Sequence, residues 1–284
     1  AEEVIKPHLD RSLYSFAASA TDISQFAVIP AQSQVTESGL YRVQFGILLT
    51  EYMQLQSGTL SFTFPDGFDL SDATIQEISD DIDGIGYYIS KSTVTGQTIT
   101  ARLMGTMALG GMTTPPVDTV EVTVILADIS NPTLAGEYRL AGAVLNADSG
   151  LVAGPSLSAP FEILPGPPAS LTITPDNDLE LSAGDVVSFS ATVADAYGNQ
   201  IDDQQPTWSL AAGSDDIGTL DGPFFRAANP GTGRVQAVLG DLSALSGEIT
   251  VISGILSRME LTLASQQVIG HSLVIEPKLL LRDR

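Results

Sequence analysis

Apolar residues recur at every second position along most of this chain. The runs 41–47, 60–64 and 120–126 show it most clearly, because each alternates large apolar side chains with polar or small ones. Successive side chains of a β-strand point to opposite faces of its sheet. Each run therefore predicts a strand with one face in a core and the other in water.

Turn-forming residues separate these runs at short intervals. Examples are Pro65-Asp66-Gly67, Gly110-Gly111 and Asn131-Pro132. Short strands with regular turns between them are typical of β-sandwiches. The fold class we predict is all-β, with tandem β-sandwiches. Only residues 70–79 also fit a helix, with Ser71 as the cap of a single turn.

The clearest domain boundary is the segment Leu164-Pro165-Gly166-Pro167-Pro168, whose prolines cannot donate to a sheet. A length of 284 residues suggests two domains and a fragment of a third. We divide the chain into an N-terminal extended segment (1–24), a β-sandwich domain (25–165), a second sandwich (168–253) and a final segment (254–284).

The second sandwich can be read strand by strand. We expect a first strand at 171–173, a long second strand whose inner face holds Val187, Phe189, Ala191 and Val193, and a third strand with Trp208. Late strands follow at 235–239 and 249–251. This pattern gives about seven short strands in one compact domain.

The succession "LSAGDVVSFSATVADAYGNQIDDQQPTWSL", "GTL" and "NPGTGRVQAVLGDLSALSGEITV" in residues 168–253 resembles a bacterial immunoglobulin-like (Ig-like) domain of the invasin and intimin type. In that family an Asp-x-x-Gly-Asn turn, here Asp195 to Asn199, leads into a strand that carries a Trp. The resemblance implies a rigid, non-catalytic spacer module of an exported protein, often in tandem. Trp208 is accordingly interpreted as a core residue between the sheets rather than a platform for sugar rings.

Two phrases of the first domain, "GTLSFTFPDGFDLSDATI" and "DTVEVTVILADISNPTLAGEYRLAGAVL", resemble β-sandwich modules of exported bacterial surface proteins. In addition, residues 259–284 can be aligned with residues 170–199, so that Leu261 and Leu263 match Leu171 and Ile173. The segment 254–284 is therefore predicted to form the opening strands of a further Ig-like repeat. Either the protein continues beyond Arg284, or another chain supplies the missing strands.

Both terminal segments are candidates for contact with other protein subunits. Residues 1–24 are either a leader or strand that packs on its own domain, or an extended segment donated to a neighbour. An unfinished sandwich at 259–284 would expose a sheet edge that a partner has to cover. The predicted partners are other subunits, bound by β-strand addition through 1–24 or 259–284.

Charge narrows the class of partner. The chain has 34 acidic and 12 basic residues, a net charge of −22 and a pI near 4.1. This charge argues against nucleic acid as a partner, since phosphate binding needs a cationic surface. The chain contains no run of 18 apolar residues, so the sequence predicts no transmembrane segment. The start, Ala1-Glu2-Glu3, fits either the mature end left by signal-peptide cleavage or a simple boundary, and we expect a secreted or cell-surface location, extracellular or periplasmic.

Candidate chemistry is sparse. The chain has no cysteine and two histidines, His8 and His271, and it lacks a G-x-S-x-G motif, so we predict no enzyme and no zinc site. The best metal candidate is a Ca²⁺ loop formed by Asp80, Asp81 and Asp83 ahead of Gly84; the alternative is a plain acidic turn. Ca²⁺ is the one cofactor the sequence suggests.

The functional hypothesis is a non-enzymatic structural or assembly protein of the bacterial cell surface: a stalk, filament or envelope-associated subunit. The alternative is a ligand-binding adhesin or a carbohydrate-binding accessory module of a secreted protein. An exposed stripe of aromatic residues would favour the alternative. Aromatic residues make up only 6% of the chain, and most, such as Tyr41, Phe45 and Phe62, occupy inward strand positions.

Overall fold

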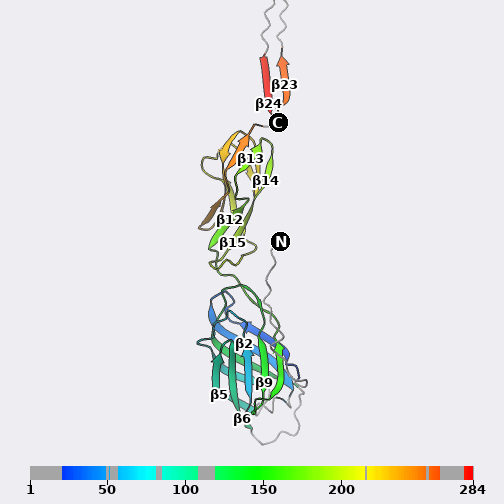
Figure 1. Ribbon diagram of the computed structural model, residues 1–284, viewed down its shortest axis with the longest axis vertical. Coiled ribbons are helices and arrows are strands. Elements are labelled where there is room, and N and C mark those ends of the chain that lie inside the picture. Colours follow the sequence, from blue (N-terminus) through cyan, green and yellow to red (C-terminus); the bar gives the residue numbers. More distant parts are fainter. Residues whose placement is uncertain are drawn as a thin grey trace, which may run out of the picture. The chain divides into compact units, whose positions relative to one another are not determined.

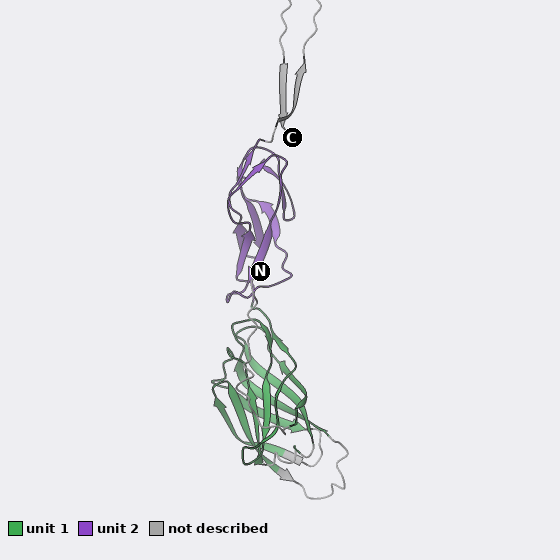
Figure 2. Cartoon of the chain, turned by 45° about the vertical axis from the view of Figure 1, so that its right-hand side comes forward, with its two compact units in different colours: residues 1–166 green, residues 167–284 purple. Residues whose placement is uncertain are grey.

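The computed structural model of the chain describes residues 21–48, 51, 57–80, 85–107, 119–214, 216–253, 256–262 and 278–283. The chain divides into two compact units, unit 1 (1–166) and unit 2 (167–284), which are shown in Figure 2 and treated separately below. Nearly all of the regular structure is β-strand, as predicted. Within the described ranges, no helix is both long and apolar enough to cross a membrane.

Unit 1 consists of two packed sheets (Figure 1). The first has the order β1-β2-β7-β4 and the second the order β10-β9-β3-β6-β5, with a short pair β11-β8 at one end. The strands are β1 (Ser24–Pro30), β2 (Ser38–Leu48), β3 (Thr59–Thr63), β4 (Thr74–Asp80), β5 (Ile85–Thr95), β6 (Thr98–Met107), β7 (Thr119–Ser130), β8 (Gly136–Tyr138), β9 (Ala141–Leu145), β10 (Leu151–Leu157) and β11 (Phe161–Ile163).

The core of unit 1 follows directly from the alternation in the sequence. The inward positions of β2, β3 and β7 are all nearly inaccessible to solvent, while their neighbours along each strand face outward. Burial of this much apolar area is the main stabilising contribution to a sandwich of this size. The fully buried side chains include Tyr41, Val43, Phe45, Ile47, Leu60, Phe62, Phe64, Val120, Val122, Val124 and Leu126.

The two sequence segments of unit 1 that resemble surface-protein modules pair with each other and have structural roles. Asp69 and Ser130 exchange both backbone hydrogen bonds, at 3.0 Å each, so the "FPDGFDLS" and "ISNP" segments pair directly. The Tyr41 hydroxyl donates to Asn131, and the Asn131 amide donates to the carbonyls of Gln32 and Gln34. These contacts are structural rather than part of a binding site.

Residues 70–79 do not form a helix. The carboxylate of Asp69 accepts a hydrogen bond from the Ser71 amide at 2.9 Å, which closes a turn and lowers the pKa of Asp69. Strand β4 then begins at Thr74 and pairs with β7. The prediction of a helical turn capped by Ser71 is therefore wrong, because Asp69 provides the capping oxygen and the chain continues as a strand.

Unit 2 contains a smaller sandwich in the range 170–252. It also contains a two-stranded sheet whose strands do not pair with those of the sandwich. The sandwich strands form the groups β12-β15, β13-β22-β19, β14-β18-β17 and β16-β20-β21. They are β12 (Ser170–Thr174), β13 (Leu179–Ser182), β14 (Val186–Ser188), β15 (Ser190–Ala194), β16 (Thr207–Leu210), β17 (Gly218–Asp221), β18 (Phe224–Ala227), β19 (Gly231–Gly233), β20 (Val235–Leu239), β21 (Leu242–Leu245) and β22 (Ile249–Ile252).

The predicted long strand through Phe189 is divided in the structure. Residues before Phe189 form β14, which pairs with β18, and residues after it form β15, which pairs with β12. Phe189 lies between the two pieces and is buried in the core of unit 2. One strand thus serves two neighbours, which the alternating pattern alone does not reveal.

The order of the strands in the sheets shows which type of sandwich each unit forms. When β5 and β6 are set aside and β8–β9 and β10–β11 are each counted as one strand, the strands of unit 1 can be labelled A to G in chain order. The two sheets then have the orders A-B-E-D and C-F-G, as in a constant-type immunoglobulin fold. Unit 2 has the same neighbours, B-E-D and C-F-G, with A beside B. Both units are Ig-like. The resemblance of residues 168–253 is confirmed at the level of the fold, and the fold extends to unit 1.

A parallel contact near the N-terminal end of each sandwich is also shared. In unit 1, Val35 donates its amide to Leu164, and Leu164 donates to Ser33. In unit 2, β13 runs parallel to β22, the last strand of the sandwich. In each unit the segment that follows the first strand thus pairs in parallel with the C-terminal end of the sandwich.

The last two strands of each sandwich also switch sheets at an identical corner. In unit 1 the Ser158 hydroxyl accepts from the Leu140 amide and donates to the Ala159 carbonyl, and Arg139 donates to the Ser158 carbonyl. The same three bonds join Ser246 to Val235, Gly247 and Arg234 in unit 2. Both serines are buried. The two units therefore share this corner, including its three hydrogen bonds.

The C-terminal segment forms a separate antiparallel pair, β23 (Leu256–Thr262) with β24 (Lys278–Asp283). A two-stranded sheet alone is marginally stable and needs further strands or a packing partner. Whether it opens another Ig-like repeat stays a prediction.

Candidate functional site: the outer face of the enlarged sheet

Strands β5 and β6 distinguish unit 1 from the plain Ig-like frame. They form a hairpin between β4 and β7, and β6 pairs with β3, so the three-stranded C-F-G sheet becomes a five-stranded one. In unit 2 the strands that correspond to β4 and β7 are β17 and β18, which form a hairpin with no strands inserted between them. The outer face of this enlarged sheet, here called the β5–β10 face, is the feature that unit 1 adds to the shared module.

Hydroxyl side chains occupy the centre of the β5–β10 face. Since Leu60, Phe62, Ile99 and Ala101 point into the core, their neighbours along β3 and β6 point outward. The register sets these outward residues side by side, and two cross-strand pairs are hydrogen-bonded: Thr63 with Thr98 at 2.8 Å and Thr93 with Thr100 at 2.7 Å. The hydroxyl residues of the face are Thr59, Ser61, Thr63, Thr93, Thr95, Thr98 and Thr100.

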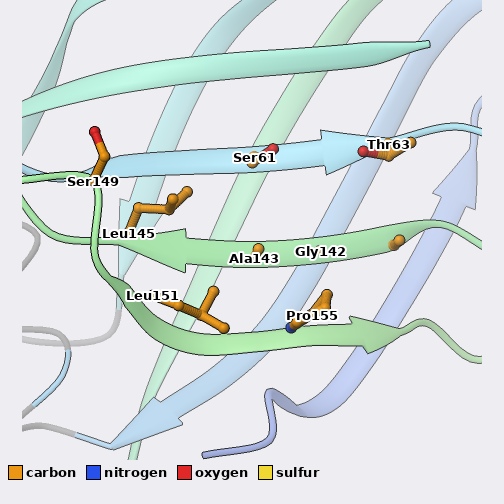
Figure 3. A pocket seen from close by; sticks show the side chains of 9 residues that line it. Ser61, Thr63, Gly142, Ala143, Leu145, Ser149, Leu151 and Pro155 are labelled. Carbon is orange, nitrogen blue, oxygen red and sulfur yellow. The ribbon is translucent and has the colours of Figure 1, made fainter. Parts of the chain in front are cut away.

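A shallow depression of about 380 Å³ lies at the β10 side of the same face. Figure 3 shows it between Ser61 and Thr63 of β3, Ala143 and Leu145 of β9, and Leu151 and Pro155 of β10. Its floor is low because β9 presents alanine there, whereas the flanking strands carry longer side chains. The depression is mainly apolar with hydroxyls along one side, which suits a ligand with both apolar and polar groups.

Two cations lie next to each other at the β5 side of the face. Lys91 and Arg102 are direct cross-strand partners, and both are exposed. Like charges placed opposite each other destabilise a sheet, so the sandwich itself gains nothing from the pair. The residues beside Arg102 in register and along the strands, namely Thr59, Thr100 and Met104, are uncharged.

An exposed aromatic ring completes this side of the face. Tyr88 is 51% exposed, lies opposite Met104, and its hydroxyl is 3.5 Å from the Met104 sulfur. The other exposed aromatics among the described residues, Tyr197 and Phe224, belong to unit 2. The described residues therefore form no aromatic stripe of the kind that would indicate stacking of several sugar rings.

The predicted calcium ligands are only partly placed. Asp80 ends β4, and Asp81 and Asp83 lie outside the described residues, so the Ca²⁺ loop stays a prediction. Burial of the ring, with a smaller contribution from the charge of Asp80, raises the pKa of Tyr87 to about 12. Among the described residues, no cluster of three or more His, Cys, Asp or Glu side chains could hold a metal ion.

Trp208 and the Asp195 turn have structural roles in unit 2. Trp208 is half-buried on β16 and packs against the core of unit 2 without being enclosed in it, and its ring centroid lies 6.5 Å from that of Phe189. Asp195 is buried and accepts from the amides of Tyr197 and Asn199 and from the Asn199 side chain. The turn is thus held by its own carboxylate and needs no bound ion.

Sequence reasoning missed the β5–β10 face, although part of the information was present. The polar half of the alternation contains the patterns Thr-x-Ser-x-Thr at 59–63, Thr-x-Thr at 93–95 and Thr-x-Thr at 98–100. Each pattern predicts outward hydroxyls on one strand. Their gathering into one face depends on the pairing of β6 with β3, about 40 residues apart, which periodicity does not supply.

Similarity to known proteins is found among solved structures alone. No family model matches the sequence, and a search of curated proteins finds no relative. Among solved structures, the chain is similar to the Escherichia coli adhesin FdeC, with 14% identity over 87% of this chain and 70% of that chain and a TM-score of 0.39.

Two further neighbours are a 282-residue C-terminal fragment of intimin, crystallised with the intimin-binding domain of its translocated receptor, and BcpA, the major pilin subunit of Bacillus cereus. The intimin fragment is 11% identical over 86% of this chain and 67% of that chain, with a TM-score of 0.24. BcpA is 10% identical over 81% of this chain and 69% of that chain, with a TM-score of 0.26. With scores this low, the strand order described above, rather than these likenesses, establishes the fold.

Proposed function

We propose that this chain is a non-enzymatic structural protein of the bacterial cell surface, in which Ig-like sandwiches act as rigid modules and contacts with other subunits build a larger assembly. The observation that carries the proposal is the repetition of one module: in both units B-E-D and C-F-G are neighbours, A lies beside B, and the same Arg–Ser corner occurs. Repeated modules with separate cores are suited to spanning distance.

The charge and the sequence resemblance support a surface location. An acidic, cysteine-free chain with a net charge of −22 stays soluble by self-repulsion and depends on no disulfide. Residues 168–253 resemble modules that occur in exported proteins. Antibody labelling of intact cells of the source bacterium tests the location: we expect labelling without permeabilisation, and labelling that requires permeabilisation would contradict it.

The point where the N-terminal segment enters unit 1 supports assembly by strand addition. Thr21 lies beside the edge strand β10 in parallel, and its carbonyl accepts from the Gly154 amide at 2.8 Å. Ile23 then donates to Ser156, and the Thr21 hydroxyl donates to Glu51. Because Thr21 and Ile23 contact this sheet edge, we propose that the segment 1–20 adds to the same edge of a neighbouring subunit.

Substitution within the segment tests this contact. In the full chain, V4D/I5D places two charges where strand addition needs apolar side chains, and we expect the assembled species to be lost. E2Q/E3Q is the control, because it changes the segment without removing apolar residues. Light scattering and electron microscopy give the readout. Assembly that survives V4D/I5D would contradict donation of this segment.

A further inference from the structure

The β5–β10 face carries functional groups that the structural role of unit 1 does not use. We propose that it is a binding face for an acidic oligosaccharide, one that carries uronic-acid carboxylates, with Lys91 and Arg102 as the carboxylate-binding pair. This activity is separate from the proposed assembly function, since the β5–β10 face lies within one copy of unit 1 and does not depend on contact between subunits.

The two cations provide the first argument. Unit 1 is strongly acidic, with 19 acidic and 6 basic residues among positions 1–165, yet two of its few bases are direct neighbours on one face. On this face Arg102 lies beside Thr59, Thr100 and Met104, none of which gives it an opposite charge. An Arg and a Lys at adjacent positions can bind a carboxylate through charge-assisted hydrogen bonds.

The hydroxyl array provides the second argument and favours a sugar over a protein. One register row runs from Lys91 through Arg102, Thr59 and Leu145 to Leu151, and so joins the cations to the depression. Five strands span about 19 Å from first to last, which accommodates several sugar rings. The hydroxyls lie in the two neighbouring rows, Thr93-Thr100-Ser61 and Thr95-Thr98-Thr63. A ligand rich in hydroxyls that lies along the face can exchange hydrogen bonds with these side chains.

A protein partner would need a different surface. Protein interfaces depend on a few large apolar or aromatic residues buried at their centre. The centre of the β5–β10 face has hydroxyls and alanine instead, and Tyr88 is its only strongly exposed aromatic among the described residues. Tyr88 lies beside the cations, where one ring can contact one sugar face.

The test is calorimetric titration of the full chain with an oligogalacturonate, and with its methyl ester as the uncharged form of the same sugar chain. We expect binding of the acid, and affinity reduced about 10- to 100-fold for the ester. K91Q/R102Q should weaken binding of the acid by the same factor. The control R42Q/R226Q removes two exposed cations from other faces and should change affinity less than about twofold.

Each outcome decides the proposal. A full chain that fails to bind the oligogalacturonate overturns it, as does equal binding of the ester or equal weakening by R42Q/R226Q. If K91Q/R102Q instead abolishes self-association measured by light scattering, with no binding of the sugar, the face docks a second copy and the glycan site is wrong. Thermal melting checks that all variants remain folded, which their exposed positions favour. Assembly through the N-terminal segment is read out separately by V4D/I5D.

Discussion

Ser158 and Ser246 each hold a corner at which two strands change sheets. Each hydroxyl is buried, accepts one backbone amide and donates to one carbonyl. In sequence they are ordinary serines in turn-rich segments. Their role could not be predicted, because it depends on which neighbouring strand leaves the sheet at that residue.

Ser158→Ala leaves the Leu140 amide buried without its acceptor. We expect a loss of about 1–3 kcal/mol in the free energy of unfolding of unit 1, measured by urea denaturation. Ser246→Ala should have an effect of the same size in unit 2, because the bonds are the same. Ser92→Ala, at an exposed position, is the control. A change below about 0.5 kcal/mol for both corner variants would contradict this account of the shared corner.

Tyr41 makes the stability of unit 1 sensitive to alkaline pH. Burial, with a smaller effect of Tyr138, raises the pKa of Tyr41, and burial raises that of Tyr138. The folded state therefore holds these phenolic protons more tightly than the unfolded state does. Their contribution is fully present below about pH 10, the unfolded value, and is lost as pH rises towards the folded pKa.

Urea midpoints at pH 8, 9.5 and 11 test this dependence. We expect little change between the first two and a clear fall at the third. Tyr41→Phe should lower stability at pH 8, since the hydrogen bond to Asn131 is lost, but should reduce the further fall at pH 11. Equal falls for both proteins would show that Tyr41 is not the titrating group.

The hairpin β5–β6 turns through Gly96-Gln97, with Gly96 at a φ of 57°. Two-residue loops of this kind favour glycine at the first position because it adopts positive φ without strain. A Cβ at Gly96 would meet no atom within 4 Å, so only the backbone conformation resists substitution.

Gly96→Ala should therefore destabilise unit 1 by about 1 kcal/mol, and Gly96→Asn by less, because Asn tolerates positive φ better than Ala. Urea denaturation of the full chain gives the comparison. If the two variants are equally stable, the loop has a different conformation from the one described.

At the level of elements, the sequence predicted strands well and their partners poorly. The alternation in 41–47, 60–64 and 120–126 identified β2, β3 and β7 with the correct inward faces. The break at Phe189 was missed because both pieces keep the same alternation while their neighbours change. Pairing is decided by contacts between distant residues, which a periodic pattern does not contain.

Over the whole molecule, the Ig-like nature of residues 168–253 could be predicted, whereas that of unit 1 could not. In unit 2 the strands follow one another closely enough for the frame to be read along the chain. In unit 1, β5 and β6 separate β4 from β7, so the shared order becomes visible only once β6 is seen to pair with β3. The inserted hairpin both hides the repeat and creates the β5–β10 face.

The proposed assembly is tested most directly by the mass of the intact 284-residue chain in solution, measured by light scattering across a range of concentrations, with and without Ca²⁺. A structural subunit that adds strands between copies should show a mass that rises with concentration to multiples of 29.8 kDa. A mass of 29.8 kDa under every condition would contradict assembly.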